Sequence, residues 1–335
     1  MDADKDQPIA IIGAGSWGTA LALQLARGDR IVELWDIDTD HLGKIAEARV
    51  NERYLPGTEF PDNLHPEMDL EKCLDDVRDI LIVVPSHGFR QTLLRLQPLL
   101  ADDMRICWAT KGFELSTGLL PHQVAEEIVG SDRPMAVLSG PTFAKEVAAG
   151  LPTAMTIAAN DNQFASDLAE EISGDSFRAY TAKDMIGVEV GGAVKNVLAI
   201  AAGLSDGLGF GANTRVALIN RGLVEMTRLG LALGAKPATF MGLAGMGDLV
   251  LTCTDNLSRN RRMGLALAAG KTIDQAQQEI QQVVEGVLAA KAVRKVAQRE
   301  GVEMPICLVL HQILYEDLAP REAVTALMGR ALKSE

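Results

Sequence analysis

A glycine-rich turn near the start of the chain is the feature that most constrains its fold. The apolar run 9–12 leads into Gly13-Ala14-Gly15-Ser16-Trp17-Gly18, and a helical pattern over 19–27 follows. Glycines at this spacing let the turn tighten, let backbone approach a pyrophosphate and let the helix pack on the strand. Amides at the helix N-terminus then meet the negative charge. This context predicts a dinucleotide site at Gly13, Gly15 and Gly18, and a glycine-rich connection without a ligand is the alternative.

The predicted second strand, 31–35, ends at Asp36, about 20 residues after the glycines. An acidic side chain at this place can accept hydrogen bonds from a ribose 2′-hydroxyl and would repel a 2′-phosphate, so Asp36 favours NAD over NADP. Asp38 and Asp40 crowd the same turn, and any of the three carboxylates could instead cap a helix that begins near Thr39.

From there the chain alternates between strands and helices up to about residue 181. The predicted strands cover 80–84, 105–109, 135–138, 153–158 and 177–181, and predicted helices include 89–100 and 121–129. This alternation predicts a Rossmann α/β domain over residues 1–184, with a mostly parallel sheet covered on both faces. The carboxyl ends of its strands, where ligands bind, carry Pro85-Ser86-His87, Thr110-Lys111-Gly112-Phe113 and Ser139-Gly140-Pro141-Thr142. Taken individually, His87 and Lys111 are more often solvated loop residues than ligand contacts.

The second half of the chain loses its strand patterns. Helical patterns cover 185–203, 214–234, 259–269, 284–299 and 305–318. We therefore predict an all-α domain over residues 185–335. The boundary has no disordered linker, so we expect a broad interface with the first domain and place the first of these helices at that junction.

One stripe of that first helix combines small residues with a single cation. At steps of four it reads Gly187, Gly191, Lys195, Ala199 and Gly203. Glycine inside a helix costs roughly 1 kcal/mol against alanine, so the stripe indicates that something comes close to this backbone. Lys195 would point into that contact. The alternative is a lysine that reaches solvent along a packing seam of small residues.

Three arginines stand at the start of another predicted helix. Ser258 is a good N-cap, and Arg259, Arg261 and Arg262 fall in the first turn, where the helix dipole is already positive. A bound anion would turn this cost into a phosphate site made of amides, dipole and guanidinium. Arginines splayed into water or paired with acidic residues are the alternative.

Composition narrows the function classes. The formal net charge of -13 argues against nucleic-acid and membrane-surface binding, because both use a basic excess. The N-terminus has no basic or apolar targeting pattern, and we expect that no segment approaches the roughly 20 apolar residues of a membrane span. Four scattered cysteines without a CxxC pair fit a reducing compartment, with neither disulfides nor a metal site: Cys73, Cys107, Cys253 and Cys307. We expect a cytoplasmic protein without a bound metal.

These segments together resemble the bacterial-type NAD(P)-dependent glycerol-3-phosphate dehydrogenases over nearly the whole chain. SGPTFAKEVA at Ser139 and SRNRRMG at Ser258 are the most specific segments. The other matching segments are GAGSWGTALA at Gly13, TKG at Thr110, GAVKNVLAIAAG at Gly192, GLAGMGDLVLTC at Gly242 and VVEGVLAAKAV at Val283. Many bacterial members carry a basic residue or histidine where this chain has Asp36, so the family's frequent NADP preference does not transfer directly.

The resemblance implies a reaction and a set of site residues. It implies reversible hydride transfer between NAD(P)H and dihydroxyacetone phosphate, giving sn-glycerol 3-phosphate for phospholipid synthesis, with Lys195 as proton donor and acceptor and Asp248 beside the substrate. It places the substrate phosphate and hydroxyls among Lys111, Gly140, Thr142, Ser258, Arg259 and Asn260. It places the dinucleotide against Ser16, Trp17, Lys111, Ala144, Arg259, Val283 and Glu285. It also makes a homodimer plausible.

Two other functions fit parts of this pattern. A β-hydroxyacid dehydrogenase shares a Rossmann domain, a helical second domain and a helical lysine, but SRNRR speaks against it, because such acids need not carry a phosphate. A protein that senses NAD(H) without turnover would have no use for a lysine, an aspartate and arginines together.

Overall fold

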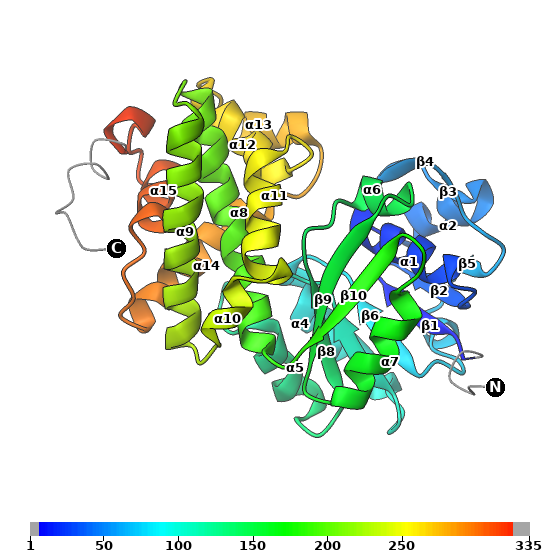
Figure 1. The fold of residues 1–335 in the computed structure, drawn as a ribbon. Helices are drawn as coiled ribbons and strands as arrows, with labels where there is room; N and C mark the ends of the chain where they lie inside the picture. Colours follow the sequence, from blue (N-terminus) through cyan, green and yellow to red (C-terminus); the bar gives the residue numbers. More distant parts are fainter. Residues whose placement is uncertain (1–6, 324–335) are drawn as a thin grey trace. The chain divides into compact units, whose positions relative to one another are not determined.

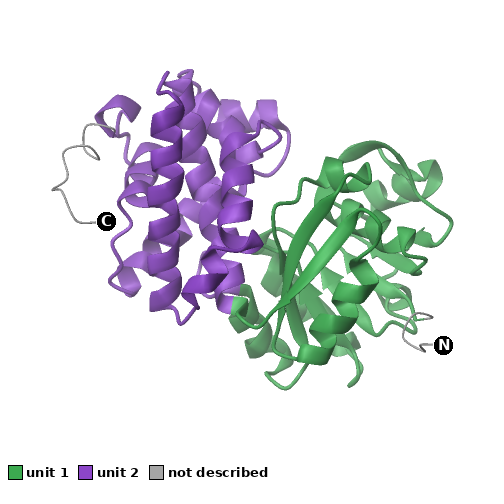
Figure 2. Ribbon diagram, in the orientation of Figure 1, with its two compact units in different colours: residues 1–111, 121–185 green, residues 112–120, 186–335 purple. Residues whose placement is uncertain are grey.

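The computed structural model describes residues 7–323, which form two compact units (Figure 2). Unit 1 takes in the chain up to residue 111 together with residues 121–185, and unit 2 takes in residues 112–120 and the chain from residue 186 onward. The predicted domain boundary after residue 184 lies next to the change from unit 1 to unit 2. Residues 112–120 differ from the prediction, because they precede the predicted boundary but belong to unit 2.

Unit 1 is built on one eight-stranded sheet in the order β10-β9-β8-β7-β6-β1-β2-β5 (Figure 1). Its strands are β1 (Ile9–Ile12), β2 (Val32–Trp35), β5 (Leu64–Pro66), β6 (Asp79–Ile82), β7 (Arg105–Trp108), β8 (Met135–Ser139), β9 (Thr153–Ala159) and β10 (Phe177–Ala182). All neighbours pair in parallel except β8 and β9, so β9 and β10 run against the other six. The predicted mostly parallel Rossmann sheet is confirmed. A small hairpin of β3 (Val50–Asn51) and β4 (Leu55–Glu59) stands apart from it.

Helices connect the strands of unit 1. They are α1 (Ser16–Arg27), α2 (Thr39–Ala48), α3 (Leu70–Cys73), α4 (Ser86–Leu96), the short 3₁₀ helix η1 (Gln97–Leu99), α5 (Pro121–Val129), α6 (Ala144–Ala148) and α7 (Asn162–Ile172). Since α1 and α4 connect strands in opposite directions along the sheet, right-handed crossovers place them on opposite faces. Two helices begin three residues earlier than predicted. Helix α1 begins directly after Gly15, which is extended, and α4 begins directly after Pro85.

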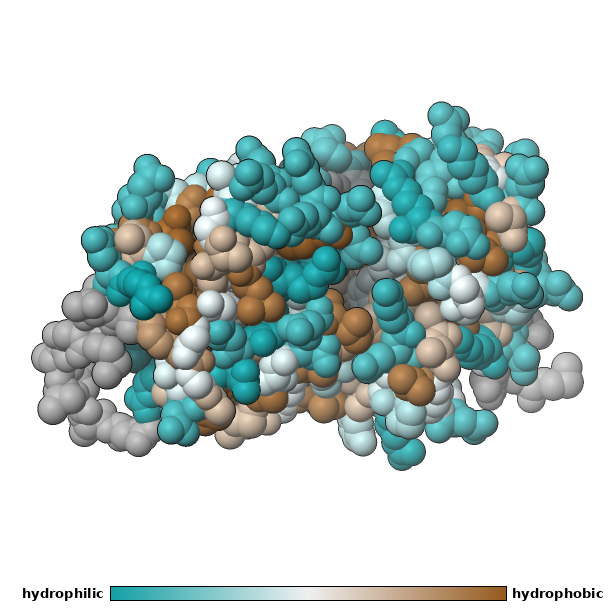
Figure 3. Space-filling model, turned by 90° about the horizontal axis from the view of Figure 1, so that it is seen from above, coloured by the Kyte–Doolittle hydropathy of each residue, from teal (hydrophilic) through white to brown (hydrophobic). Residues whose placement is uncertain are grey.

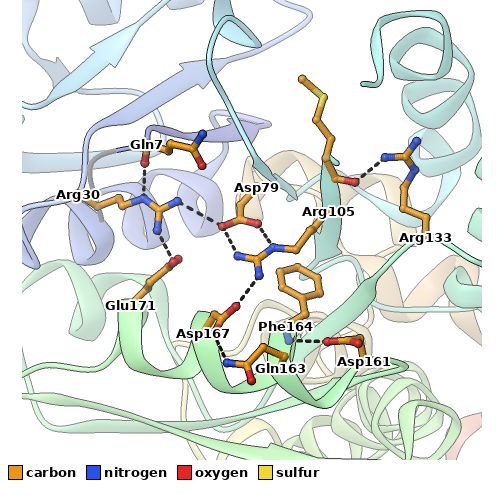
Figure 4. A network of polar contacts seen from close by, with 11 residues as sticks. Gln7, Arg30, Asp79, Arg105, Arg133, Asp161, Gln163, Phe164, Asp167 and Glu171 are labelled. Carbon is orange, nitrogen blue, oxygen red and sulfur yellow. Dashed lines mark hydrogen bonds and ion pairs between the residues drawn. The ribbon is translucent and has the colours of Figure 1, made fainter. Parts of the chain in front are cut away.

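A buried network of charged side chains ties the amino ends of these strands together (Figure 4). Arg105 Nε lies 2.6 Å from Asp79 Oδ1, and its Nη1 lies 2.5 Å from Asp167 Oδ2. Arg30 Nη2 lies 3.2 Å from Asp79 Oδ2, and Arg30 also pairs with Glu171. Asp79 and Arg105 are the first residues of β6 and β7. The network therefore lies at the edge opposite to the carboxyl ends where ligands of such sheets bind, and we assign it to the fold.

Unit 2 is helical, as predicted. Its elements are α8 (Met185–Gly207), α9 (Ala212–Ala232), α10 (Pro237–Phe240), the π-helix η2 (Leu243–Gly247), α11 (Asp248–Thr254), α12 (Arg259–Ala268), α13 (Ile273–Ile280), α14 (Glu285–Arg299) and α15 (Pro305–Tyr315). Sequence analysis did not predict α10, η2, α11 or α13, which are short or carry few apolar positions. Residues 112–120 join this unit because Phe113 and Leu120 lie in its hydrophobic core.

Helix α8 is the central element of unit 2. It is long and apolar enough to cross a membrane by length and composition, which corrects the expectation that no segment approaches such a span. In the structure 89% of its most apolar window is buried within the protein, as expected for a core helix.

Figure 3 shows one face of the molecule, on which hydrophilic and apolar residues are interspersed.

The glycine stripe of α8 lets other parts of unit 2 approach its backbone. A Cβ on Gly191 would collide with the carbonyl oxygen of Ala244 in η2, and a Cβ on Gly203 would collide with that of Arg261 in α12. The predicted close approach is therefore confirmed, and protein backbone occupies it at these two positions. The stripe thereby brings η2 and the start of α11 next to Lys195.

Candidate active site

Lys195 and Asp248 form a buried ion pair in unit 2. Lys195 comes from the middle of α8, and Asp248 is the first residue of α11. Lys195 Nζ lies 2.5 Å from Asp248 Oδ1, and the two side chains are 10% and 1% exposed. The alternative of a lysine that reaches solvent is therefore wrong. A buried ammonium of this kind needs a countercharge and hydrogen-bond acceptors, and Asp248 supplies the charge.

Thr252 completes this cluster. It follows Asp248 by four residues on α11, so both side chains lie on the same helix face. Thr252 Oγ1 donates to the Asp248 carbonyl oxygen at 2.6 Å and lies 3.1 Å from Lys195 Nζ, where it accepts. Thr252 was not predicted from the sequence. Its spacing from Asp248 within GMGDLVLTC was the signal that could have identified it.

A second polar network lies beside Lys195. Its neighbour Asn196 accepts from Asn260 Nδ2 at 2.8 Å and donates to Glu285 Oε2 at 3.3 Å. Asn260 Oδ1 in turn accepts the backbone N–H of Gly286 at 2.9 Å. The structure therefore connects two predicted site residues, Asn260 and Glu285, through Asn196, which sequence analysis did not single out.

The three arginines of α12 have different surroundings. Arg261 is buried, with its Nη1 2.5 Å from Asp206 Oδ2 and its Nε donating to Asn256 Oδ1 at 3.0 Å. For Arg261 the alternative of an arginine paired with an acidic residue is correct. Arg259 is half-buried and Arg262 is exposed. The prediction that Ser258 caps α12 is confirmed, since its Oγ accepts the Arg261 backbone N–H at 3.2 Å.

In unit 1 the glycines of the first turn serve different purposes. Gly13 has a φ of +120°, and a Cβ there would collide with the carbonyl oxygen of Val83. A Cβ on Gly18 would collide with the carbonyl oxygen of Gly13, whereas a Cβ on Gly15 would meet no described atom within 4 Å. Gly13 and Gly18 therefore let the turn and helix pack, and the space at Gly15 is open.

This turn fits an anionic ligand. Helix α1 carries no acidic residue in its first turn, and among the described residues no side chain caps it. Its first amides therefore face the open space at Gly15 with a positive dipole, as a pyrophosphate requires. Ser16 and Trp17, both predicted to contact the dinucleotide, are half-buried in this first turn.

The hairpin of β3 and β4 forms hydrogen bonds with the same turn. Asn51 Nδ2 donates to the Ala14 carbonyl oxygen and to Thr19 Oγ1, both at 2.8 Å. Ser16 Oγ donates to the Tyr54 carbonyl oxygen at 2.8 Å. These hydrogen bonds were not predicted, because residues 50–54 carry no strand or helix pattern.

Asp36 connects the turn with the end of β2. Its Oδ2 accepts the Ala14 N–H at 2.6 Å, and its Oδ1 accepts the Asp38 N–H at 2.9 Å. The cap of α2 is Asp38, which accepts the His41 N–H at 3.0 Å. Of the alternatives open in the sequence, helix capping therefore falls to Asp38, and Asp36 stands at the carboxyl end of β2.

The other predicted residues of unit 1 follow β7 and β8. These strands are parallel to β6 and β1, so Lys111 and Gly140 lie at the same sheet edge as Gly13. A Cβ on Gly140 would collide with the backbone of Met155 in β9, which explains the glycine. Thr142 Oγ1 donates to the Gly140 carbonyl oxygen at 3.3 Å. Two more predicted residues lie at or near helix starts. Ala144 is the first residue of α6, and Val283, in unit 2, is an exposed residue shortly before α14.

The cysteines stand outside this chemistry. All four are buried, and none forms a disulfide. Burial raises the pKa of the Cys253 thiol to about 12, although Lys195 and Arg261 oppose the shift. Burial likewise raises the pKa values of Cys73, Cys107 and Cys307. They therefore stay protonated thiols near neutral pH and supply no thiolate nucleophile.

Comparison with known proteins agrees with these features. The models of the N-terminal and C-terminal parts of NAD-dependent glycerol-3-phosphate dehydrogenase match residues 8–165 and 184–325. The glycerol-3-phosphate dehydrogenase (NAD(P)+) of Klebsiella pneumoniae is 58% identical over 328 residues, which cover 98% of this chain and 97% of the relative. That of Escherichia coli is 55% identical over 332 residues, covering 99% and 98%.

A solved structure is similar over the same length. The crystal structure of glycerol-3-phosphate dehydrogenase from Coxiella burnetii has a TM-score of 0.95 and 52% sequence identity, and the match covers 97% of this chain and 99% of that one. These relatives do not favour a β-hydroxyacid dehydrogenase or a sensor without turnover. The chain belongs to the family of NAD-dependent glycerol-3-phosphate dehydrogenases.

Proposed function

We propose that this protein is an NAD(P)-dependent dehydrogenase that interconverts dihydroxyacetone phosphate and sn-glycerol 3-phosphate. The observation that carries the proposal is the buried cluster of Lys195, Asp248 and Thr252. A carbonyl reduction needs a proton at the oxygen as the carbon accepts a hydride, and a positioned lysine can supply it. The domain over residues 1–184 binds the dinucleotide, and the domain over residues 185–335 binds the substrate.

Lys195 is the proton donor and acceptor in this proposal. As an ammonium it polarises the ketone and protonates the C2 oxygen, and as a neutral amine it takes the proton back in the reverse direction. Asp248 supplies the countercharge that makes a lysine tolerable at a buried place. The Thr252 hydroxyl, whose proton is engaged by the Asp248 carbonyl oxygen at 2.6 Å, directs a lone pair at Nζ and so fixes its position.

When bound, the dinucleotide would donate the hydride as NAD(P)H and accept it as NAD(P)+. The open space at Gly15 and the first amides of α1 would hold its pyrophosphate, and Asp36 would accept from its ribose. The glycine spacing and the family resemblance assign further contacts to Gly13, Ser16, Trp17, Gly18, Lys111, Ala144, Arg259, Val283 and Glu285. The fit rests on the uncapped start of α1 and on the glycine turn.

The substrate phosphate is held at the start of α12. Because Arg261 is engaged with Asp206 and Arg262 is exposed, Arg259 is the arginine of this turn that we assign to the phosphate. Ser258 and Asn260 flank it, and the family resemblance also assigns Lys111, Gly140 and Thr142 to the substrate. Lys195 and Asp248 contact the reacting end of the substrate.

Three further assignments follow the family. We propose a role in phospholipid precursor synthesis, a homodimeric state and a cytoplasmic location. The four buried free cysteines support the location, because such thiols persist in a reducing compartment. The homodimer follows from the resemblance.

Loss of absorbance at 340 nm on adding dihydroxyacetone phosphate to protein and NADH or NADPH tests the activity directly. Dihydroxyacetone, which lacks the phosphate, and oxidation of a β-hydroxy acid with NAD+ serve as the comparison reactions. We expect turnover with dihydroxyacetone phosphate to exceed both by at least tenfold. Equal turnover with the β-hydroxy acid would reject the proposed substrate, and binding of NADH without any turnover would indicate a sensor.

A further inference from the structure

An exposed arginine stands next to the place proposed for the ribose. Arg53, between β3 and β4, has its Nη1 3.4 Å from Asp38 Oδ2, and the two side chains are 58% and 49% exposed. Asp38 follows Asp36 by two residues and donates its N–H to the Asp36 carboxylate. Arg53 therefore reaches the same turn after β2 from which Asp36 faces the ribose.

Several contacts fix the position of Arg53. Its neighbour Tyr54 accepts from Ser16 Oγ through its carbonyl oxygen and donates its N–H to Asn51 Oδ1 at 3.2 Å. The guanidinium of Arg53 lies 4.8 Å above the Tyr54 ring, and that ring packs edge-on against His41 of α2 at 5.2 Å. Stacking on an aromatic ring holds the plane of a guanidinium and leaves its edges free to donate.

Asp36 alone does not decide the cofactor here. Each of its two oxygens already accepts one backbone N–H, at 2.6 and 2.9 Å, so the carboxylate is anchored between the glycine turn and the turn after β2. It can still accept from a ribose hydroxyl, because a carboxylate has about four acceptor positions. A cation at the same turn can offset the repulsion that a 2′-phosphate would meet there.

We propose that Arg53 is a specificity-determining residue that binds the 2′-phosphate of NADP(H), with Asp38 competing for the same guanidinium. The inference rests on the proposed dinucleotide binding by unit 1. A nearby arginine is the usual means by which Rossmann sites accept a 2′-phosphate, and a guanidinium edge matches a phosphate with two donors. The site thereby accepts both cofactors, because Asp36 serves the ribose hydroxyl of NADH and Arg53 serves the phosphate of NADPH.

Binding without substrate tests this assignment. Calorimetric titration should compare NADPH with NADH, and 2′,5′-ADP with 5′-AMP, which differ only by the 2′-phosphate. In Arg53→Gln we expect the Kd values for NADPH and 2′,5′-ADP to rise about tenfold, while those for NADH and 5′-AMP change less than twofold. Lys72→Gln, which removes an exposed cation of unit 1 from α3, should leave all four unchanged.

A second variant tests the competition by Asp38. Asp38→Asn keeps an acceptor for the His41 N–H, so the cap of α2 remains, but removes the charge that holds Arg53. We expect NADPH to bind about two- to fivefold more tightly and NADH to bind as before. This gain should shrink when Arg53→Gln is present.

The outcomes separate the two proposals. Equal weakening of NADH and NADPH in Arg53→Gln, or no change in either, would overturn the role of Arg53. Selective weakening of NADPH in a protein that does not reduce dihydroxyacetone phosphate would support Arg53 and reject the proposed activity. If wild-type protein bound none of the four nucleotides, the dinucleotide site itself would be rejected, and Arg53 with it.

Discussion

Lys195 Nζ lies 2.5 Å from Asp248 Oδ1, although 53 residues separate the two in the chain. Removal of one partner from such a buried pair leaves an uncompensated charge and costs roughly 3–5 kcal/mol of stability. Loss of activity in a single variant can therefore reflect unfolding as well as chemistry. Each prediction for this cluster accordingly pairs turnover with a measurement of the folded state.

Thr252 should act by positioning Lys195. Thr252→Val removes the hydroxyl that lies 3.1 Å from Nζ, and we expect kcat to fall about ten- to a hundredfold, because a hydrogen bond to a charged group contributes roughly 1.5–3 kcal/mol. Thr252→Ser keeps the hydroxyl and should retain most of the activity. Steady-state kinetics and thermal unfolding of both variants check this. If serine and valine lowered kcat equally, the hydroxyl would have no part in the reaction.

Arg259 and Arg261 should separate into a substrate role and a fold role. Arg259→Ala should lower kcat/KM for dihydroxyacetone phosphate about ten- to a hundredfold more than kcat/KM for dihydroxyacetone, because only the first ketone carries the phosphate. Arg261→Met should instead lower the free energy of unfolding by about 3 kcal/mol, at the lower end of the range for a broken buried pair, because Asp206 keeps its ion pair with Arg215.

The ratio of kcat/KM for the two ketones distinguishes these roles. It should change in Arg259→Ala and stay constant in Arg261→Met. A constant ratio in Arg259→Ala would assign this arginine to the cofactor or to the fold, and the phosphate would need another partner.

Glu225 should make stability depend on pH. Its carboxylate accepts the N–H groups of Ile306 and Cys307 at 2.7 and 3.1 Å, yet burial raises its pKa above the ordinary 4.5. The folded state therefore favours the protonated acid. Its contribution is fully present below the unfolded pKa and is lost as pH rises through the folded pKa.

Unfolding by urea between pH 4.5 and pH 8 checks this sign. The stability of wild type relative to Glu225→Gln should decrease as pH rises, because the amide cannot ionise. A wild-type advantage that grew with pH would show that the two backbone hydrogen bonds outweigh burial.

The fold was readable from sequence where apolar runs are long and local. The strands β1, β2, β6, β7, β8, β9 and β10 and the long helices of unit 2 were predicted within a few residues. The short strands β3, β4 and β5 contain sequences such as LPGTE and LHP and depend on their neighbours rather than on propensity. The reversed direction of β9 was not predicted, because an alternation of strands and helices favours parallel strands. In the structure β8 and β9 are antiparallel, and only the five-residue α6 lies between them.

The candidate site was readable to the extent that its residues follow local patterns. The stripe of small residues around Lys195 predicted that other backbone comes close to α8. The glycine spacing at Gly13 predicted a tight turn between a strand and a helix. Arg261 pairs with Asp206, which lies 55 residues away in the chain, and no helical pattern in the sequence predicts this ion pair. The support of the first turn by Asn51 and Tyr54 likewise depends on tertiary contacts across 32 to 38 residues.

The kinetics of Lys195→Ala, measured beside its binding of NADH, test the central claim most directly. We predict that kcat falls about 100- to 10,000-fold, as for a positioned acid or base, while the Kd for NADH changes little and the protein stays folded. A small primary amine added to this variant should restore part of the rate, because it can supply the missing proton. A fall in kcat of less than about tenfold in a folded variant would contradict the account and assign the proton to another residue.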